Sequence, residues 1–551
     1  MLAREEQAED PRGDRQWESI PNLVASAAKR FGSTEALVDG ETRLSFADLA
    51  DQTMQATRAV IAAGVAHGDR VAIWAPNIAE WVLCALGALG AGAVVVPLNT
   101  RYKGPEAADV LARSGAVTLF TVQGFLGNDY PAMLAGSALP DLKRIVLLRE
   151  DGERGAGTQE IATSTGEAPL ISWAAFLASG SQISPAEFQA RWDSVRGEDL
   201  SDLIFTSGTT GRPKGAMTTH AQTLRTFATW ASIVGLTHGD RYLVVNPFFH
   251  TFGYKAGIIA SLISGATIVP EAVFDVDRVL AKVATERISM LPGPPTLYQS
   301  ILDHTERSKY DLSSLRLAVT GAAAVPVHLI ERMRSELTFS TVLTAYGLTE
   351  STGVVTMCRR GDAADTISAT SGRAIPDVEV QVIDSTGKAL AAGEAGEITV
   401  RGYNVVMGYF GDPEATSDAI DTEGWLHTGD VGVLDASGNL AITDRIKDMF
   451  IVGGFNVYPA EIEAALLRHP SIAQVAVIGI PDERQGEVGC AVVVARAGAN
   501  CETLPGEVIA WSRDQMANFK VPRRVEMMES LPLNASGKVL KRELRAKLTG
   551  H

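Results

Sequence analysis

The stretch that decides the fold is Thr206-Ser-Gly-Thr-Thr-Gly-Arg-Pro-Lys-Gly215, which lies between two short apolar runs, Leu203–Phe205 and Ala216–Thr218. We expect both runs to be strands. Between them, glycines let the backbone bend so that N–H groups converge, while hydroxyls and one lysine add further donors. Such a loop is suited to the β- and γ-phosphates of a nucleotide. The residues expected to bind there are Thr206, Ser207, Gly208, Thr209, Thr210, Gly211 and Lys214.

The loop differs from the P-loop of kinases and ATPases. That loop reads GxxxxGK[ST] and opens directly into a helix. Here Lys214 is followed by Gly215 and then by a strand-like segment. A surface turn rich in Gly and Thr is the ordinary alternative, and the two flanking strands argue against it.

Outside this loop, strand-like apolar runs alternate with helical patterns along most of the chain. That alternation predicts an α/β protein with layered subdomains and largely parallel sheets. After about Val378 the pattern changes to short strands and turns, which predicts a β-rich subdomain, and a small α+β unit is expected to follow. The strands expected in the layered part are Arg70–Ala75, Ala93–Pro97, Val117–Thr121, Ile145–Leu148, Thr267–Val269, Met290–Leu291 and Leu315–Thr320.

The length of 551 residues exceeds the size at which one hydrophobic core keeps growing, so more than one domain is expected. We predict a disordered tail over residues 1–16, a large N-terminal domain over 17–446 and a small mobile C-terminal domain over 447–551. The second boundary follows the change of pattern around 444–448. Residues 150–169, rich in Gly, Glu, Ala and Thr, are expected to form a surface insertion.

A formal net charge of -16 argues against a general nucleic-acid binder and against a protein held on anionic membranes. The longest apolar run, Val82–Leu98, is interrupted by glycines, so we interpret it as a buried helix and strand rather than a membrane span. The four cysteines form no CxxC pair and the charged N-terminus contains no apolar stretch, which favours a cytoplasmic protein without a secretory signal. No pattern indicates an oligomeric state, so a homo-oligomer stays open.

Four further motifs follow the loop along the chain. The loop and these four motifs resemble the sequence motifs of the adenylate-forming superfamily. That superfamily includes acyl-CoA synthetases, peptide-synthetase adenylation domains and luciferases. The motifs stand in the family's order over almost the whole chain, so coincidence is negligible. The four are Tyr346-Gly-Leu-Thr-Glu350, Thr428-Gly-Asp430, Asp444-Arg-Ile-Lys-Asp448 and Pro532-Leu-Asn-Ala-Ser-Gly-Lys538.

The resemblance implies that the protein binds ATP and Mg²⁺. Thr349 would contact the α-phosphate, Asp430 would accept both ribose hydroxyls, and Arg445 would lie near the ribose. Lys538 would be the catalytic lysine. A hard cation prefers carboxylate and hydroxyl oxygens, and the metal ligands would be Thr206 and Glu350. Gly321, Ala322 and Ala323 would flank the adenine and the acyl group, and Ala345, Tyr346 and Gly347 would also bind the nucleotide.

The resemblance also implies a two-step reaction. The substrate carboxylate would attack the α-phosphorus of ATP to form an acyl-adenylate and pyrophosphate. The thiol of coenzyme A would then attack the acyl carbon, and AMP would leave. Between the steps the C-terminal domain would rotate about a hinge at Lys447, and Gly453 and Gly454 would line the channel for the pantetheine arm.

The segment PFFHTFGYKAGI, residues 247–258, is expected to form one wall of the acyl site. By the family's pattern, Phe249 and His250 would gate that site, with His250 among the catalytic residues. Lys255 would donate to a ring carbonyl, and the small Gly257 and Gly293 would leave room for a fused ring. This segment and LPGPPTLYQS, residues 291–300, are similar to those of bacterial ligases that activate a steroid-derived bicyclic propanoate.

The sequence also bears on other acid substrates and other acceptors of the acyl group. An amino acid would need a buried carboxylate for its ammonium group, and the wall segment contains none, which favours a plain organic acid. The chain ends soon after Lys538, so free coenzyme A is expected rather than a fused carrier domain. A general short- or medium-chain or aromatic acid ligase remains the main alternative, and an oxidase that acts on its own adenylate shares every motif. A nucleotide sensor is disfavoured because Lys538 and Glu350 are both present.

Overall fold

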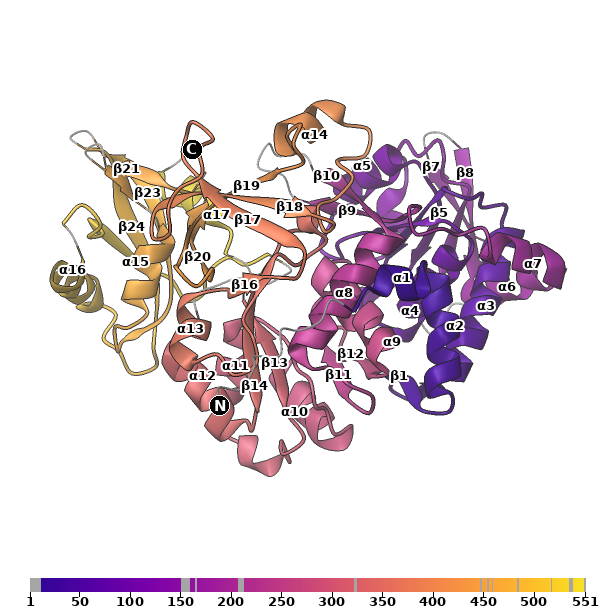
Figure 1. Ribbon diagram of the computed structural model, residues 1–551, viewed down its shortest axis with the longest axis horizontal. Coiled ribbons are helices and arrows are strands. Elements are labelled where there is room, and N and C mark those ends of the chain that lie inside the picture. Colours follow the sequence, from indigo (N-terminus) through magenta and orange to yellow (C-terminus); the bar gives the residue numbers. More distant parts are fainter. Residues whose placement is uncertain are drawn as a thin grey trace.

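The computed structural model of the protein describes residues 11–149, 159–163, 166–206, 213–321, 325–445, 448–452, 455–457, 459–482, 485–516, 518–534 and 539–549. Within them the chain forms layered α/β subdomains, a β-rich subdomain and a small C-terminal α+β unit (Figure 1). The predicted fold class is therefore confirmed. The C-terminal elements, drawn in gold, and the first third of the chain, in indigo and purple, lie at opposite ends of the long axis in Figure 1.

The phosphate-loop strands belong to an eight-stranded sheet with the order β10-β9-β4-β3-β5-β6-β8-β7. Its inner strands are parallel and buried on both faces, which explains their continuous apolar sequences. At one edge β10 turns back antiparallel to β9. The strands are β3 (Arg70–Trp74), β4 (Val94–Pro97), β5 (Ala116–Thr121), β6 (Arg144–Leu147), β7 (Gln159–Thr163), β8 (Gly166–Ser172), β9 (Leu200–Thr206) and β10 (Lys214–Thr219).

The other edge of this sheet corrects a prediction. Residues 150–169 were expected to form a surface insertion. Instead β8 pairs in parallel with β6, with Leu170 opposite Ile145, and β7 adds an antiparallel edge strand. Ala168, near the end of the segment, and Leu170, just after it, are buried, so the described part of the segment that forms β8 contributes to the core.

A second layer is built from two four-stranded sheets, β11-β12-β1-β2 and β13-β14-β15-β16. Met290 joins them by single bridges to Tyr242 and Leu317, so the strand predicted at Met290–Leu291 is reduced to one bridging residue. The strands are β1 (Glu35–Asp39), β2 (Thr42–Ser45), β11 (Arg241–Val244), β12 (Thr267–Pro270), β13 (Leu317–Thr320), β14 (Thr341–Tyr346), β15 (Thr356–Met357) and β16 (Arg373–Ala374).

Several helices, α8 among them, begin where a side chain caps a free N–H group. Thr219 accepts from the Gln222 N–H at the start of α8, and the Gln222 side chain accepts from the Thr219 N–H. α8 ends at Gly235, whose φ of 78° suits glycine. The helices of the layered part are α1 (Gly13–Trp17), α2 (Ile20–Phe31), α3 (Phe46–Ala62), α4 (Ala79–Gly90), α5 (Gly104–Ser114), α6 (Trp173–Ser179), α7 (Pro185–Trp192), α8 (His220–Val234), α9 (Ala260–Ser264), α10 (Val276–Thr285), α11 (Pro295–Leu302), α12 (Val327–Glu336) and α13 (Ala364–Ala369).

The apolar run that raised the question of a membrane span is the buried helix α4 followed by the buried strand β4. Throughout the described ranges, no helix combines the length and the apolar character needed to cross a bilayer. The first helix, α1, begins at Gly13, within the range predicted as a tail, and Gly13 packs tightly against the Leu224 carbonyl oxygen.

The β-rich subdomain is an antiparallel sheet in the order β17-β18-β19-β20, and α14 (Pro413–Ala419) lies before its third strand. The C-terminal unit pairs β22-β21-β24-β23, with β25 parallel to β24. The remaining elements are β17 (Val378–Ile383), β18 (Ala395–Gly402), β19 (Leu426–Leu434), β20 (Leu440–Arg445), β21 (Phe450–Val452), β22 (Phe455–Val457), β23 (Ile472–Asp482), β24 (Gly486–Ala495), β25 (Arg524–Met527), α15 (Pro459–Leu466), α16 (Leu504–Gln515) and α17 (Lys541–Thr549).

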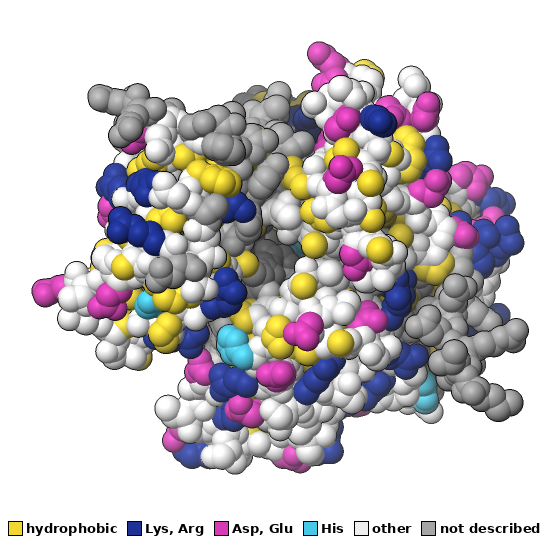
Figure 2. Space-filling view, turned by 60° about the vertical axis from the view of Figure 1, so that its left-hand side comes forward, with side chains coloured by type: hydrophobic (Ala, Val, Ile, Leu, Met, Phe, Trp, Pro, Cys, Tyr) yellow, Lys and Arg dark blue, Asp and Glu magenta, His cyan; other side chains and the backbone are white. Residues whose placement is uncertain are grey.

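Buried apolar side chains form one continuous core from Trp17 to Leu440 and two separate clusters in the C-terminal unit. Those clusters begin at Phe450 and Ala476. The face shown in Figure 2 is hollowed near its centre, and cationic and anionic side chains are interspersed over it.

Candidate active site

The antiparallel pair β9 and β10, called the phosphate hairpin below, ends at Thr206 and Lys214. The sequence predicts that both of these residues bind the nucleotide. β9 and β10 pair so that Lys214 lies opposite Thr206. Arg113, on α5, donates to the Pro213 carbonyl oxygen at 2.5 Å and anchors the returning strand. The predicted loop residues Ser207, Gly208, Thr209, Thr210 and Gly211 lie outside the described residues.

Thr206 contacts the carboxylate of Glu350, although 144 residues separate them in the chain. The Thr206 hydroxyl donates to Glu350 Oε1 at 3.2 Å, and the Tyr409 hydroxyl donates to the same oxygen at 2.9 Å. The Lys214 ammonium lies 5.1 Å from the centre of the Tyr409 ring. Burial and the nearby charge of Glu350 both raise the pKa of Tyr409, so it remains a hydrogen-bond donor at neutral pH.

Tyr409 is a site residue that the sequence analysis missed. It belongs to the segment Gly408-Tyr-Phe410, where Met217 donates to the Gly408 carbonyl oxygen and Phe410 donates to the Gly215 carbonyl oxygen. These contacts attach the segment to β10. A single tyrosine after a glycine has no distinctive pattern, so only the pairing with β10 identifies it.

Asp430 lies on β19 just after Gly429, whose φ of 68° turns the chain. The Tyr346 hydroxyl, at the end of β14, donates to Asp430 Oδ2 at 2.6 Å, and Asp430 is 4% exposed. Arg445 stands opposite Asp430 across β19 and β20. Three of the residues predicted to bind the nucleotide thus lie close together, although they come from separate strands.

The predicted adenine-side residues lie at the carboxyl ends of β13 and β14. Gly321 follows β13, and a side chain there would lie 3.0 Å from the Ala345 carbonyl oxygen. Gly347 follows β14 and packs against the Gly353 backbone, which leaves no room for a side chain. Thr349 opens the short 3₁₀ turn η6 (Thr349–Ser351) that carries Glu350. Ligands of open α/β sheets commonly bind beyond such strand ends.

The acyl-wall segment is held by Asn77, whose amide donates to the carbonyl oxygens of Val244 and Asn246 at 3.0 and 2.9 Å. Phe248 N–H donates to the Asn77 side chain at 2.7 Å. Next along the segment, Phe249 is half-buried and His250 is exposed. The surrounding protein nevertheless lowers the pKa of His250 by desolvation, so the ring is neutral at pH 7.

The structure corrects the prediction for Lys255. Its side chain is 1% exposed, and its ammonium lies 2.9 Å from Asp202 Oδ1 on β9. Lys255 therefore contributes to the core behind the wall rather than to the lining of the acyl site. Asp202 supplies a buried carboxylate that the wall segment itself lacks. Because Lys255 neutralises this carboxylate, Asp202 is not free to bind the ammonium group of an amino acid, and a plain organic acid is still favoured as the substrate.

The two glycines expected to leave room for a ring are also corrected. A side chain at Gly257 would meet Val244 Cγ1 at 2.8 Å, and one at Gly293 would meet Leu297 Cδ1 at 2.7 Å. Both positions are filled by neighbouring core residues. Their small size allows close packing and does not create space for a substrate.

We expect Gly257→Ala to destabilise the protein by about 1–3 kcal/mol, because the added methyl group overpacks a filled core. Thermal unfolding measures this. The matched control is Gly506→Ala on α16, where an added methyl group would meet nothing within 4 Å beyond its own helix backbone, and the better helix propensity of alanine should leave stability unchanged or slightly higher. An unchanged Tm for Gly257→Ala would restore the view that this glycine borders open space.

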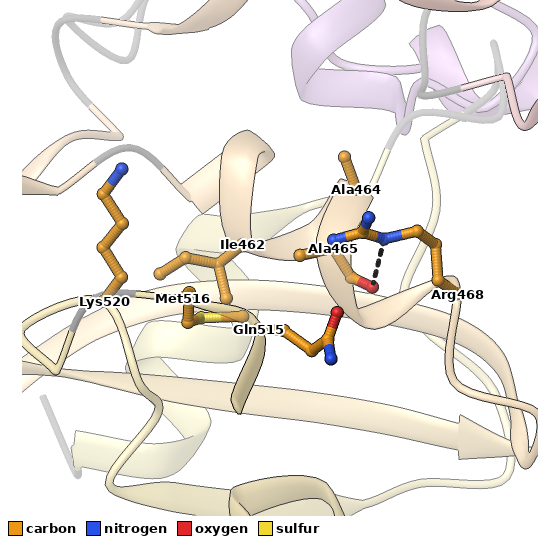
Figure 3. A pocket seen from close by; sticks show the side chains of 7 residues that line it. All are labelled: Ile462, Ala464, Ala465, Arg468, Gln515, Met516 and Lys520. Carbon is orange, nitrogen blue, oxygen red and sulfur yellow. Dashed lines mark hydrogen bonds between the residues drawn. The ribbon is translucent and has the colours of Figure 1, made fainter. Parts of the chain in front are cut away.

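Six further predicted residues, Ala322, Ala323, Lys447, Gly453, Gly454 and Lys538, lie outside the described residues. For Arg445 only the backbone position is described. A cavity of about 360 Å³ lies in the C-terminal unit between α15 and α16 (Figure 3). Arg468 and Lys520 border an apolar floor there, and Arg468 Nε donates to the Ala465 carbonyl oxygen at 3.5 Å. None of the predicted site residues lines this cavity.

Comparison with known proteins agrees with this geometry. Residues 24–410 match the family model for AMP-binding enzymes, and residues 461–538 match that for the AMP-binding enzyme C-terminal domain. A 3-[(3aS,4S,7aS)-7a-methyl-1,5-dioxo-octahydro-1H-inden-4-yl]propanoyl:CoA ligase from Rhodococcus jostii (strain RHA1) is 50% identical, over 96% of this chain and 98% of that protein. A ligase of the same name from Mycobacterium tuberculosis (strain ATCC 25618 / H37Rv) is 48% identical over the same shares.

Solved structures give the same result at lower identity. The anthranilate CoA ligase AuaEII in complex with anthranoyl-AMP superposes with a TM-score of 0.85 at 27% identity, covering 96% of this chain and 97% of its own. ATP-bound MatB from Rhodopseudomonas palustris gives 0.81 at 28% identity, covering 96% and 98%. On these matches and on the site geometry, this chain belongs to the AMP-binding enzyme family, within the adenylate-forming superfamily.

Proposed function

We propose that the protein is an ATP-dependent acyl-CoA ligase whose acid is a steroid-derived ring propanoate, the indene-dione propanoate in the names of its two relatives. One observation supports the chemistry: the phosphate hairpin ends at Thr206 and Lys214 against the carboxylate of Glu350. The choice of acid is supported by identities of 50% and 48% over almost the whole chain. Lys255 gives it no support, because it is buried.

In the first step the substrate carboxylate attacks the α-phosphorus of ATP, giving an acyl-adenylate and pyrophosphate. This step brings anions together, so neutralising charge is the main requirement. Lys214 and the hairpin would hold the β- and γ-phosphates, and Thr349 and Lys538 would contact the reacting phosphate. Asp430 would hold the ribose. His250, neutral and open to solvent, would close the acyl side.

The donor set around Glu350 fits a magnesium ion. A carboxylate oxygen and the Thr206 hydroxyl lie 3.2 Å apart at the end of β9. Magnesium binds in proteins through one or two carboxylates and takes its other ligands from phosphates and water. When bound, it supplies positive charge to the phosphates of ATP. Tyr409 and Thr206 orient the carboxylate for that role.

In the second step the thiol of coenzyme A attacks the acyl carbon, and AMP leaves. We propose that residues 447–551 form the mobile domain, with the hinge at Lys447, and that Gly453 and Gly454 line the channel for the pantetheine arm. The separate apolar clusters of the C-terminal unit support such a boundary. All four cysteines are free thiols, which supports a reducing compartment such as the cytoplasm.

The test is to incubate purified protein with ATP, Mg²⁺ and a panel of linear, aromatic and ring-keto propanoic acids, with and without coenzyme A. Products are identified by mass spectrometry. We expect an acyl-AMP from the ring-keto propanoate, converted to its CoA thioester when coenzyme A is added. A linear acid of equal carbon count used with equal efficiency would overturn the choice of acid. AMP without a thioester would overturn the choice of acceptor.

Tyr409→Phe is expected to raise the Mg²⁺ concentration that half-saturates adenylate formation by roughly three- to tenfold. The change removes the hydroxyl that orients Glu350, and such a hydrogen bond contributes about 0.5–1.5 kcal/mol. Titrating Mg²⁺ at saturating ATP measures this. Tyr403→Phe in the same subdomain is the matched control, because the Tyr403 ring packs on the Arg225 guanidinium. An equal shift in both variants would contradict the assignment.

A further inference from the structure

The Lys255–Asp202 ion pair is a feature that the reaction outlined above does not use. The ammonium and carboxylate are 2.9 Å apart, and the two side chains are 1% and 0% exposed. Asp202 also accepts from the Ser201 hydroxyl at 2.6 Å, through its second oxygen. Within the described ranges, no other carboxylate forms an ion pair with Lys255.

The pair joins the two halves of the candidate active site. Asp202 lies on β9, the strand that ends at Thr206, and it is opposite Val95 of β4 and Thr218 of β10. Lys255 lies five residues beyond His250, on the segment that forms the acyl wall. A single contact therefore links the strand that leads to the phosphates with the segment that carries the acid gate.

Lys255 occupies an uncommon backbone geometry. Residues Phe252–Ile259 form the π-helix η4, and the Ala260 N–H bonds to the Lys255 carbonyl oxygen, five residues back. π-Helical turns are rare and occur frequently at functional sites. Two tryptophans contact this turn: Trp81 lies 5.4 Å from Tyr254, and Trp230 lies 6.2 Å from Phe252, between ring centres.

Stability alone does not account for a buried pair of this kind. Taking both charges out of water costs several kcal/mol per ion, and replacing such a pair by neutral groups is often harmless. The nearby groups do not compensate, because the Tyr254 hydroxyl and His220 Nε2 are also buried without hydrogen-bond partners. Burial lowers the pKa of His220 to about 3, so it adds no charge. What the pair does provide is a fixed position of η4 relative to β9.

We propose that the Lys255–Asp202 pair is a positioning device that fixes the η4 turn, and with it His250, against the strand ending at Thr206. This inference rests on the proposed function, because the role given to the ion pair is to align the acid substrate with the α-phosphate of ATP. β9 is held on both sides by β4 and β10, whereas η4 has no sheet partners. Loss of the pair should therefore displace the acid side and leave the ATP side in place.

The experiment compares Lys255→Met, Asp202→Asn and the double variant. Each single change leaves one buried charge unpaired and is expected to lower Tm by several degrees, whereas the double variant should regain most of that loss. In the double variant we expect KM for the acid to rise and the kcat of adenylate formation to fall, each by roughly tenfold, because small misplacements of reacting groups are costly. KM for ATP should change by less than about twofold. Pyrophosphate release without coenzyme A measures all three constants.

The control is Arg316→Met, which breaks an ion pair whose carboxylate, Asp240, is buried just before β11, away from η4, although the Arg316 side chain itself is 36% exposed. It should lower Tm without changing KM for the acid. The near-UV circular dichroism of Trp81 and Trp230 reports on η4 independently of activity. An unchanged spectrum, or a double variant that regains both Tm and the wild-type KM for the acid, would overturn the positioning role. A wild-type protein that adenylates no acid would instead contradict the proposed function, and the spectrum would still test the pair.

Discussion

Replacing Glu350 by glutamine is expected to lower the rate of acyl-adenylate formation by a factor on the order of 10²–10³. The substitution removes a negative charge and a strong oxygen ligand at the point where the phosphate hairpin ends. The Thr206 and Tyr409 hydroxyls donate to Glu350 Oε1, and an amide oxygen can still accept from them. The fold should therefore survive, and the loss should appear in the chemistry and in the Mg²⁺ dependence.

Pyrophosphate release with a saturating acid and a Mg²⁺ titration measures this effect. The matched control is Glu414→Gln, an exposed glutamate on α14, which should retain the wild-type rate. A rate for Glu350→Gln within about threefold of wild type, at unchanged Tm, would place the metal elsewhere.

Replacing Asp430 by alanine is expected to raise KM for ATP at least about 10²-fold. The carboxylate would accept both ribose hydroxyls, and hydrogen bonds to a charged group contribute about 1.5–3 kcal/mol each. The neighbouring Tyr346 hydroxyl, which donates to Asp430 at 2.6 Å, would lose its acceptor in the same change.

Initial rates over a range of ATP concentrations measure this effect, with nucleotide binding by calorimetry as a second readout. Tyr346→Phe separates the two roles, since it keeps the carboxylate and removes only the donor that orients it. We expect its KM for ATP to rise by roughly three- to tenfold, corresponding to one hydrogen bond. If both variants lowered kcat without raising KM for ATP, the ribose assignment would be wrong.

The sequence by itself determined the family and most of the strands of the layered part. β9 and β10 were predicted within three residues at each end, because alternation and glycine-rich turns are local properties of the chain. The five motifs likewise lie within short segments, and the structure brings Thr206 and Glu350, from two of them, within 3.2 Å of each other.

Only the tertiary structure decided which side chains contact one another across the subdomains. Tyr409 reaches Glu350 across 59 residues, and Lys255 turns inward to Asp202 rather than toward the substrate. Gly257 is small because Val244 packs on it, not because a ring needs space. Local periodicity predicts whether a residue is buried, but the direction of a side chain and its partner depend on how distant strands and helices pack. For that reason the sequence identified the chemistry, and the fold decided how the acid and the nucleotide are held relative to each other.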